Sequence, residues 1–134
     1  MSVYLQLRLA EEKYAIQIDQ VIQVARFGDL TAVPGSPAAL LGVRNLRGQV
    51  LPVIDLAQLL GISGTTQPAH LVVGTAGGRQ AGLAIDEVTE IGELADPTQE
   101  TDSAVLAGAS LADGELIGVI DMVRVFDAVA GVRQ

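Results

Sequence analysis

Two aspartates in equivalent settings are the residues that most suggest catalysis. Asp55 and Asp121 each follow a Val-Ile pair and precede an apolar segment. Paired carboxylates that share a proton are the machinery of aspartic proteases, where two β-rich halves each supply one Asp. That chemistry wants each Asp followed by a hydroxyl residue and a glycine, whereas Leu-Ala and Met-Val follow here. We therefore interpret both aspartates as helix N-caps, whose side-chain oxygens accept from backbone amides of the first turn.

The remaining candidates for catalysis or metal binding lack essential parts. His70 is the single histidine and the chain has no cysteine, so a Cys–His pair or a His-based metal site has too few groups. No nucleophile-elbow pattern frames a serine, and Gly77-Gly78 is not followed by the Lys-Ser/Thr of a phosphate loop. Glu87 and Glu90 would face opposite sides of a strand. We predict a protein that is not an enzyme and has no metal or cofactor.

A polar corner offers a different kind of chemistry, the recognition of another protein. Residues 40–55 contain two apolar runs on either side of Asn45-Leu46-Arg47-Gly48-Gln49. An arginine at such a corner is a poor core residue but a good contact for a partner, because its fork of donors suits carboxylates and carbonyls. Gly48 supplies the positive φ that a tight hairpin corner requires. After the second run, Asp55 opens a short helical pattern that ends at Gly61.

Composition and charge limit the possible partners. The chain has 134 residues, of which 49% are hydrophobic and 3% aromatic, so an aliphatic core can form. Residues 1–67 carry five acidic and five basic residues, whereas residues 68–134 carry eleven acidic and three basic residues and hold the whole net charge of −8. Such a half would repel nucleic acid. The N-terminal residues do not resemble a signal peptide and no apolar run could span a membrane, so we expect a cytoplasmic protein without direct membrane insertion.

The elements that must position the corner are short and mostly extended. Residues 3–9 alternate apolar and polar side chains, which is typical of a half-buried strand, and further strand patterns cover 14–18, 70–73, 80–85, 87–91, 104–109 and 114–120. Residues 63–68 have linker composition, and residues 121–129 form a terminal helical pattern. Short strands at turn-rich spacing, with helices of one or two turns, favour small β-barrels over a parallel sheet.

An internal repeat organises these elements. A shift of 67 places residues 13–29 on 80–96, and a shift of 66 places residues 40–61 on 106–127. Apolar positions, turn glycines and the helix-opening aspartates then recur in the same order. The chain therefore contains two copies of one small β unit, each ending in a short helix. We expect approximate subdomains at residues 1–67 and 68–134.

The repeat separates residues required by the fold from candidates for function. Both copies keep a glycine at the start of the hairpin, a glycine at its corner and the N-cap aspartate, so we assign these to structure. The corner itself reads Asn45-Leu46-Arg47-Gly48 in the first copy and Leu111-Ala112-Asp113-Gly114 in the second. The arginine and the amide are specific to the first copy, which makes them candidates for function. The structural set comprises Gly42, Gly48, Asp55, Gly114 and Asp121.

The segment from Gly42 to Leu56, GVRNLRGQVLPVIDL, resembles the signature of CheW-like domains. The likeness extends from the segment Tyr14–Val24, through the loop at 34–38 and the strand at 83–88, to the closing segment 118–126. It implies the fold of that family, two five-stranded SH3-like barrels around a shared apolar core. That expectation agrees with the internal repeat. It also implies one CheW-like domain over residues 1–134, with no kinase or receiver sequence attached.

The resemblance implies a non-catalytic adaptor that couples methyl-accepting chemoreceptors to a CheA-type histidine kinase. One surface would dock on the regulatory domain of the kinase and another on the helical hairpin tip of the receptor, so that the protein is recruited to membrane receptor arrays. Two alternatives stay open at this point. The chain could serve a chemosensory pathway that controls pili or another output, or it could be a small β-barrel protein that binds a ligand or acts as a hydrolase.

The motif positions of the family select the partner-binding candidates. Arg47 is the expected polar contact to the receptor, and Asn45 is expected to hold the corner by bonding backbone. Apolar positions on the neighbouring strands would line a groove between the barrels that could accept a helix. Family members often carry an acidic residue near Gln23, so the neutral amide here is a departure. The full set of partner-binding candidates is Arg47, Asn45, Val24, Gln23, Val43 and Arg44.

Overall fold

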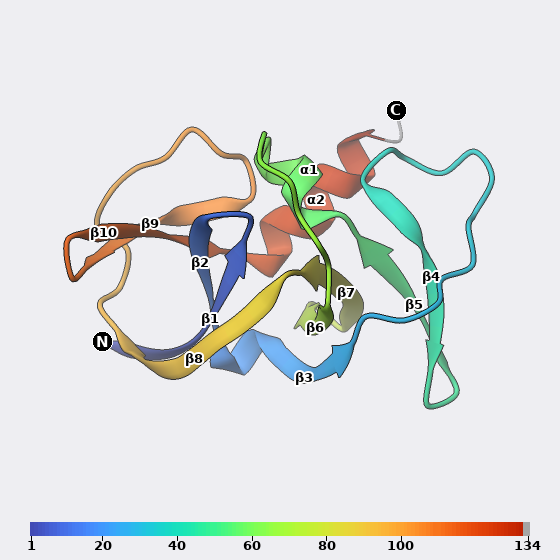
Figure 1. The fold of residues 1–134 in the computed structure, drawn as a ribbon, viewed down its shortest axis with the longest axis horizontal. Helices are drawn as coiled ribbons and strands as arrows, with labels where there is room; N and C mark the ends of the chain where they lie inside the picture. Colours follow the sequence, from blue (N-terminus) through green and yellow to red (C-terminus); the bar gives the residue numbers. More distant parts are fainter. Residues whose placement is uncertain (133–134) are drawn as a thin grey trace.

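The computed structural model describes residues 1–132, with side-chain environments through Val129. Ten strands, two α-helices and one 3₁₀ turn occupy that range (Figure 1). In chain order they are β1 (Ser2–Leu9), β2 (Glu12–Gln17), η1 (Ile18–Gln20), β3 (Val21–Arg26), β4 (Leu40–Leu46), β5 (Gln49–Ile54), α1 (Leu56–Leu60), β6 (His70–Ala76), β7 (Arg79–Ile85), β8 (Glu87–Leu94), β9 (Leu106–Ala112), β10 (Glu115–Ile120) and α2 (Met122–Val132).

The strands form two five-stranded sheets with the same internal order. The first sheet runs β8-β1-β2-β10-β9 and the second runs β3-β6-β7-β5-β4. The shifts of 66 and 67 convert one order into the other, strand by strand. The two parallel pairs within residues 1–132 also correspond, since β10 lies beside β2 with Val119 opposite Ala15, and β5 lies beside β7 with Val53 opposite Gly82. The predicted mainly-β fold with two equivalent five-stranded units is therefore confirmed.

The two sheets do not follow the two halves of the sequence. β1 of the first half pairs with β8 of the second and β2 pairs with β10, which carries β9. In the other sheet β3 pairs with β6, and β5, which carries β4, pairs with β7. Each repeat thus contributes strands to both sheets, and the linker at 63–68 is not a boundary between them. Periodicity identifies which residues form strands, but the partner of a strand is set by tertiary packing that periodicity does not encode. In Figure 1 the blue and orange-red strands accordingly lie together at one end of the molecule.

The largest hydrophobic cluster joins the two sheets, as expected for a shared core. It includes Leu5 and Leu7 of β1, Val72 of β6 and Leu83 of β7, all of which are almost fully buried. Both helices add to it. Two smaller clusters lie within single sheets, one in the first and one in the second. The helix residues in the shared cluster are Leu56, Ala57, Met122, Val125 and Phe126.

The C-terminal helix is fixed at its start and along one side. The backbone N–H of Met122 donates to Oε1 of Gln20 at 3.3 Å, and the guanidinium of Arg79 lies 4.5 Å from the centroid of the Phe126 ring. The helix was expected over 121–129 and begins one residue later. No helix within residues 1–132 is long and apolar enough to cross a membrane.

Candidate partner-binding site

The polar corner is a two-residue turn that joins β4 to β5. Leu46 and Gln49 are the last paired residues of the hairpin, so Arg47 and Gly48 form the turn. Their φ angles are 55° and 83°. Positive φ at both central positions is the signature of a type I′ turn, which matches the twist of the flanking strands. The corresponding turn between β9 and β10 has Asp113 and Gly114 at φ 51° and 79°.

Arg47 occupies a backbone conformation that suits it poorly. A type I′ turn favours Asn, Asp or Gly at its first central position, because a side chain at positive φ crowds the following carbonyl. Asp113 satisfies this preference, whereas Arg47 does not. From the sequence, positive φ is expected for Gly48 alone. The structure shows that the backbone of Arg47 is left-handed as well.

The Arg47 side chain is exposed and makes no ion pair with the part of the chain that the structure describes. Among the described residues, no carboxylate lies within ion-pair distance of its guanidinium. The exposed guanidinium therefore stands at the tip of a hairpin without an ion pair to the described residues. That is the arrangement expected of an arginine available to a partner.

Asn45 secures the turn from within. Its Oδ1 accepts a hydrogen bond from the backbone N–H of Gly48 at 2.9 Å. The Asn45 residue is exposed beside the tip. Leu111, the corresponding residue of the second copy, cannot make this bond. The first hairpin therefore carries a polar support that its counterpart lacks.

Arg44 contacts another segment of the same chain. Its Nη1 donates to the backbone carbonyl of Arg26, at the end of β3. Its guanidinium lies beside Gly28, where an added Cβ would be 3.4 Å from Arg44 Cζ. β3 and β4 are opposite edges of the second sheet. This contact joins the end of β3 to β4, and the bridge between Thr31 and Val43 pairs β4 with the segment 27–39 that leads to it from β3.

The other candidates lie along those edges. Val24 of β3 is 42% exposed, and Gln23 beside it is half-buried. Val43 of β4 is half-buried and lies between Thr31 of the segment 27–39 and Pro52 of β5. The structure thus groups four of the candidates on β4 and its turn, and places the other two on β3 at the opposite edge of the same sheet.

The residues assigned to structure have contacts of that kind. Asp55 Oδ1 accepts from the backbone N–H of Gln58 at 3.2 Å at the start of α1, and Asp121 Oδ1 accepts from that of Val123 at 3.0 Å. These aspartates serve the first turns of helices, which leaves no shared site of the protease type.

Gly42 lies within β4 rather than in a turn. A Cβ there would lie 2.6 Å from the carbonyl oxygen of Thr31. A Cβ added at its counterpart Gly108 would likewise lie 2.8 Å from the carbonyl oxygen of Gln99. Each glycine therefore permits the segment before its strand to pair with that strand at close range: residues 27–39 with β4, and residues 95–105 with β9. Gly48 and Gly114 have no atom within 4 Å of an added Cβ, so their requirement comes from φ alone.

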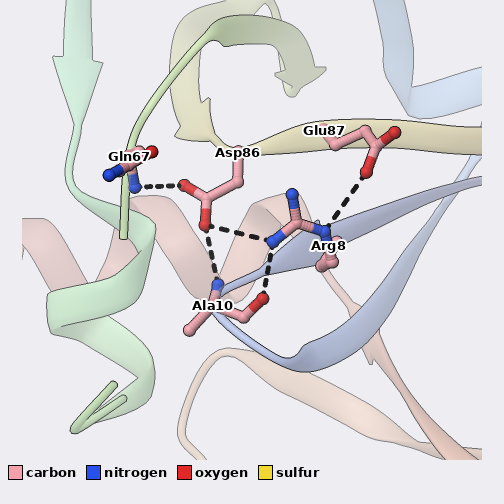
Figure 2. Close-up of polar contacts among 5 residues, drawn as sticks. All are labelled: Arg8, Ala10, Gln67, Asp86 and Glu87. Carbon is pink, nitrogen blue, oxygen red and sulfur yellow. Dashed lines mark hydrogen bonds and ion pairs between the residues drawn. The ribbon is translucent and has the colours of Figure 1, made fainter. Parts of the chain in front are cut away.

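One buried carboxylate outside the hairpin was not singled out from the sequence. Asp86 accepts from the backbone N–H groups of Ala10 at 2.8 Å and Gln67 at 2.9 Å, and Arg8 Nη1 lies 3.7 Å away (Figure 2). Arg8 also donates to Ala10 O at 2.6 Å and to Glu87 Oε2 at 3.2 Å. These donors tie the turn after β1 and the linker to the corner between β7 and β8, so the cluster is a structural clamp. No set of residues in the described range is arranged to hold a metal ion.

Comparison with known proteins places these features in a family. The family model described as CheW-like domain matches residues 3–130. The probable chemotaxis protein CheW of Rhizobium etli is 34% identical over 129 residues, which cover 89% of this chain and 83% of the relative. The chemotaxis protein CheW of Thermotoga maritima is 29% identical over 132 residues, which cover 93% and 87%.

A solved structure extends the likeness to three dimensions. The scaffolding protein TtCheW from Thermoanaerobacter tengcongensis superposes with a TM-score of 0.79 at 29% sequence identity, over 90% of this chain and 84% of that one. Its likeness confirms the predicted fold of two SH3-like units.

Proposed function

The chain belongs to the CheW-like domain family, and on that premise we propose that it couples methyl-accepting chemoreceptors to a CheA-type histidine kinase. It is a non-catalytic adaptor of chemotaxis signal transduction. The relatives named above are chemotaxis proteins, which supports this output over a pathway for pili. The hydrolase and ligand-binding alternatives gain no support from the described residues, where the paired aspartates cap helices.

The observation that carries the assignment of a contact site is the arginine at the β4–β5 turn. Arg47 stands at positive φ, is exposed and has no carboxylate partner among the described residues, and the second copy replaces it with Asp113. A residue that adopts a costly backbone conformation and makes no ion pair with the described residues is best explained by a contact to a partner. We assign Arg47 to the receptor, whose helical tip would offer carboxylates and carbonyls to its fork of donors.

The remaining candidates support this contact to different degrees. Asn45 keeps the turn in shape, and Arg44 joins β4 to β3, so both act by positioning Arg47. Val24, Gln23 and Val43 offer partly exposed side chains on the two edges of the same sheet. We propose that Val24 and Val43 form the apolar part of the docking surface, on which a helix of a partner could lie, and that Gln23 adds a polar contact beside Val24.

We further propose that residues 1–134 act as one domain, because each sheet needs strands of both halves. A fragment that ends in the linker would leave the first sheet without β8, β9 and β10. The protein would work in the cytoplasm, next to the receptor tips and the kinase, within the receptor arrays.

A binding experiment with purified components tests the proposal. The full chain is titrated with the regulatory domain of a CheA-type kinase and with a receptor cytoplasmic fragment, separately and together. We expect binding to both, and weaker ternary complexes for Arg47→Ala. The matched control is Asp113→Ala at the equivalent turn of the other sheet, which should bind like wild type. Binding to neither component would contradict the adaptor function, and equal loss in both variants would remove Arg47 from the site.

A further inference from the structure

A groove on the first sheet has no role in the proposed function. It has a volume of about 430 Å³ and lies over β2, β10 and β9, beside the segment that crosses from β8 to β9. Its apolar floor includes Leu106, Ala109, Leu116 and Gly118, and Tyr14 closes its inner end. This face is separate from the β4–β5 hairpin, which belongs to the second sheet.

The strand register makes the floor continuous. Gly118 lies opposite both Tyr14 and Ala109, and Leu116 lies opposite Leu111. Side chains two residues apart on a strand share a face, so these positions form one surface across three strands. At its outer end Leu111 is 58% exposed and Leu116 is 60% exposed. Two large aliphatic side chains are thus presented to solvent next to a hollow.

Gly118 lets two larger side chains pack closely over its strand. A Cβ at this position would lie 2.8 Å from Tyr14 Cδ1 and 2.9 Å from Leu106 Cδ1. The side chains of Tyr14 and Leu106 therefore cover Gly118 at close range, and together with it they line the groove.

The rim of the groove is acidic. Glu11, Glu12 and Glu115 line it, and Thr101 at the far side stands between two further acidic residues in the sequence. Among the described residues Lys13 is the one basic side chain that lines the groove, and its Nζ lies 3.1 Å from Glu115 Oε2. Glu11 and Glu12 form no ion pair within the described range and would favour a partner with basic side chains.

The equivalent face of the second sheet carries a different charge pattern. There the repeat places Arg79 at the position of Glu12 and Gln49 at the position of Glu115. The same backbone arrangement therefore carries glutamates in the first sheet where the second carries a basic and a neutral residue, so one partner cannot suit both faces equally.

We propose that the groove on the first sheet binds a basic amphipathic helix of a partner protein. Aliphatic side chains on one face of the helix would enter the hollow between Tyr14 and Leu116, and lysine or arginine side chains would meet the carboxylates of the rim. An added β-strand is a poorer occupant. The backbone of Ala109, on the edge strand beside the groove, is already hydrogen-bonded to Gln99 of the crossing segment.

A designed peptide serves as the probe. It has about 18 residues, with Leu at helical i, i+3, i+4 and i+7 spacing and Lys at the remaining positions. Fluorescence anisotropy measures its binding to the full chain, and amide chemical shifts locate the contact. We expect saturable binding with shifts at residues 11–14 and 106–118. A scrambled peptide of the same composition should bind about tenfold more weakly, because it has no continuous apolar face.

Two double variants with the same change in net charge separate specific docking from general attraction. Glu11→Lys with Glu12→Lys should weaken peptide binding about tenfold. Glu90→Lys with Glu93→Lys changes exposed carboxylates that do not line the groove and should change affinity by less than about twofold. Equal weakening by the two double variants would overturn the proposal. So would equal binding of the scrambled peptide, or shifts confined to the β4–β5 hairpin.

Discussion

Replacing Arg47 by asparagine should make the protein more stable and less functional at once. Arg47 stands at φ 55°, in the left-handed region. That region costs an ordinary L-residue about 1–2 kcal/mol, whereas asparagine adopts it readily. Recovering part of that cost should raise the free energy of unfolding by about 1 kcal/mol. Since the Cβ of an alanine would be crowded in the same way, Arg47→Ala should leave stability nearly unchanged.

The corresponding thermal shift is measurable. Unfolding entropy is about 2.1 cal/mol/K per residue, so for 134 residues it is about 0.28 kcal/mol/K. A gain of about 1 kcal/mol therefore raises Tm by about 4 °C. Far-ultraviolet circular dichroism during heating and urea titration provides the assay. Asp113→Asn is the control, because aspartate already suits the same turn, and its Tm should change little.

Binding should move in the other direction. A hydrogen bond to a charged group contributes about 1.5–3 kcal/mol, so loss of the guanidinium should weaken receptor binding about tenfold or more. If Arg47→Asn is no more stable than wild type, the turn carries no strain at this position and the stability prediction is wrong. If the variant is more stable but binds the receptor fragment as wild type does, Arg47 is not a contact residue.

Three further predictions concern stability. In urea titrations Gly42→Ala should lower the free energy of unfolding several times more than Gly48→Ala does. The reason is that a Cβ added at Gly42 would lie 2.6 Å from the carbonyl oxygen of Thr31, whereas a Cβ added at Gly48 would meet no described atom within 4 Å. Equal losses in the two variants would contradict this. Asp86→Ala should destabilise by about 3 kcal/mol, because two backbone N–H groups lose their acceptor, and a cost below about 1 kcal/mol would show that the clamp is dispensable. Burial, with a smaller effect of nearby Glu12, raises the pKa of Tyr14 to about 12. The neutral phenol therefore stabilises the folded protein fully below the unfolded pKa of 10.0, and this stabilisation is lost as the pH rises from 10 to 12. Over that range the free energy of unfolding should fall more in wild type than in Tyr14→Phe, as measured by urea titration at each pH.

The internal repeat carried most of the fold prediction. Matching positions such as Val53-Ile54-Asp55 and Val119-Ile120-Asp121 correspond to strands at the same place in two equivalent sheets. The exchange of strands between the halves was missed. Nothing in the pattern of Val21–Arg26 states that β3 pairs with β6, beyond the linker, because alternation fixes the face of a side chain and leaves the neighbour open.

The candidate site was predictable in position but less so in role. The corner could be found because Arg47 breaks the repeat, and its exposure agrees with that reasoning. The left-handed backbone of an arginine could not be anticipated, since local preference favours Asn, Asp or Gly there. The contact of Arg44 with Arg26 and the clamp at Asp86 both join segments distant in sequence. Such contacts depend on the fold as a whole.

Receptor control of kinase activity tests the central claim most directly. A CheA-type kinase and receptor cytoplasmic fragments arrayed on vesicles are mixed with the full chain, and kinase autophosphorylation is measured with and without receptor ligand. The account predicts that wild type and Asp113→Ala make kinase activity depend on the receptor, whereas Arg47→Ala does so only weakly. Kinase activity that stays independent of the receptor when the wild-type chain is present would contradict the adaptor function.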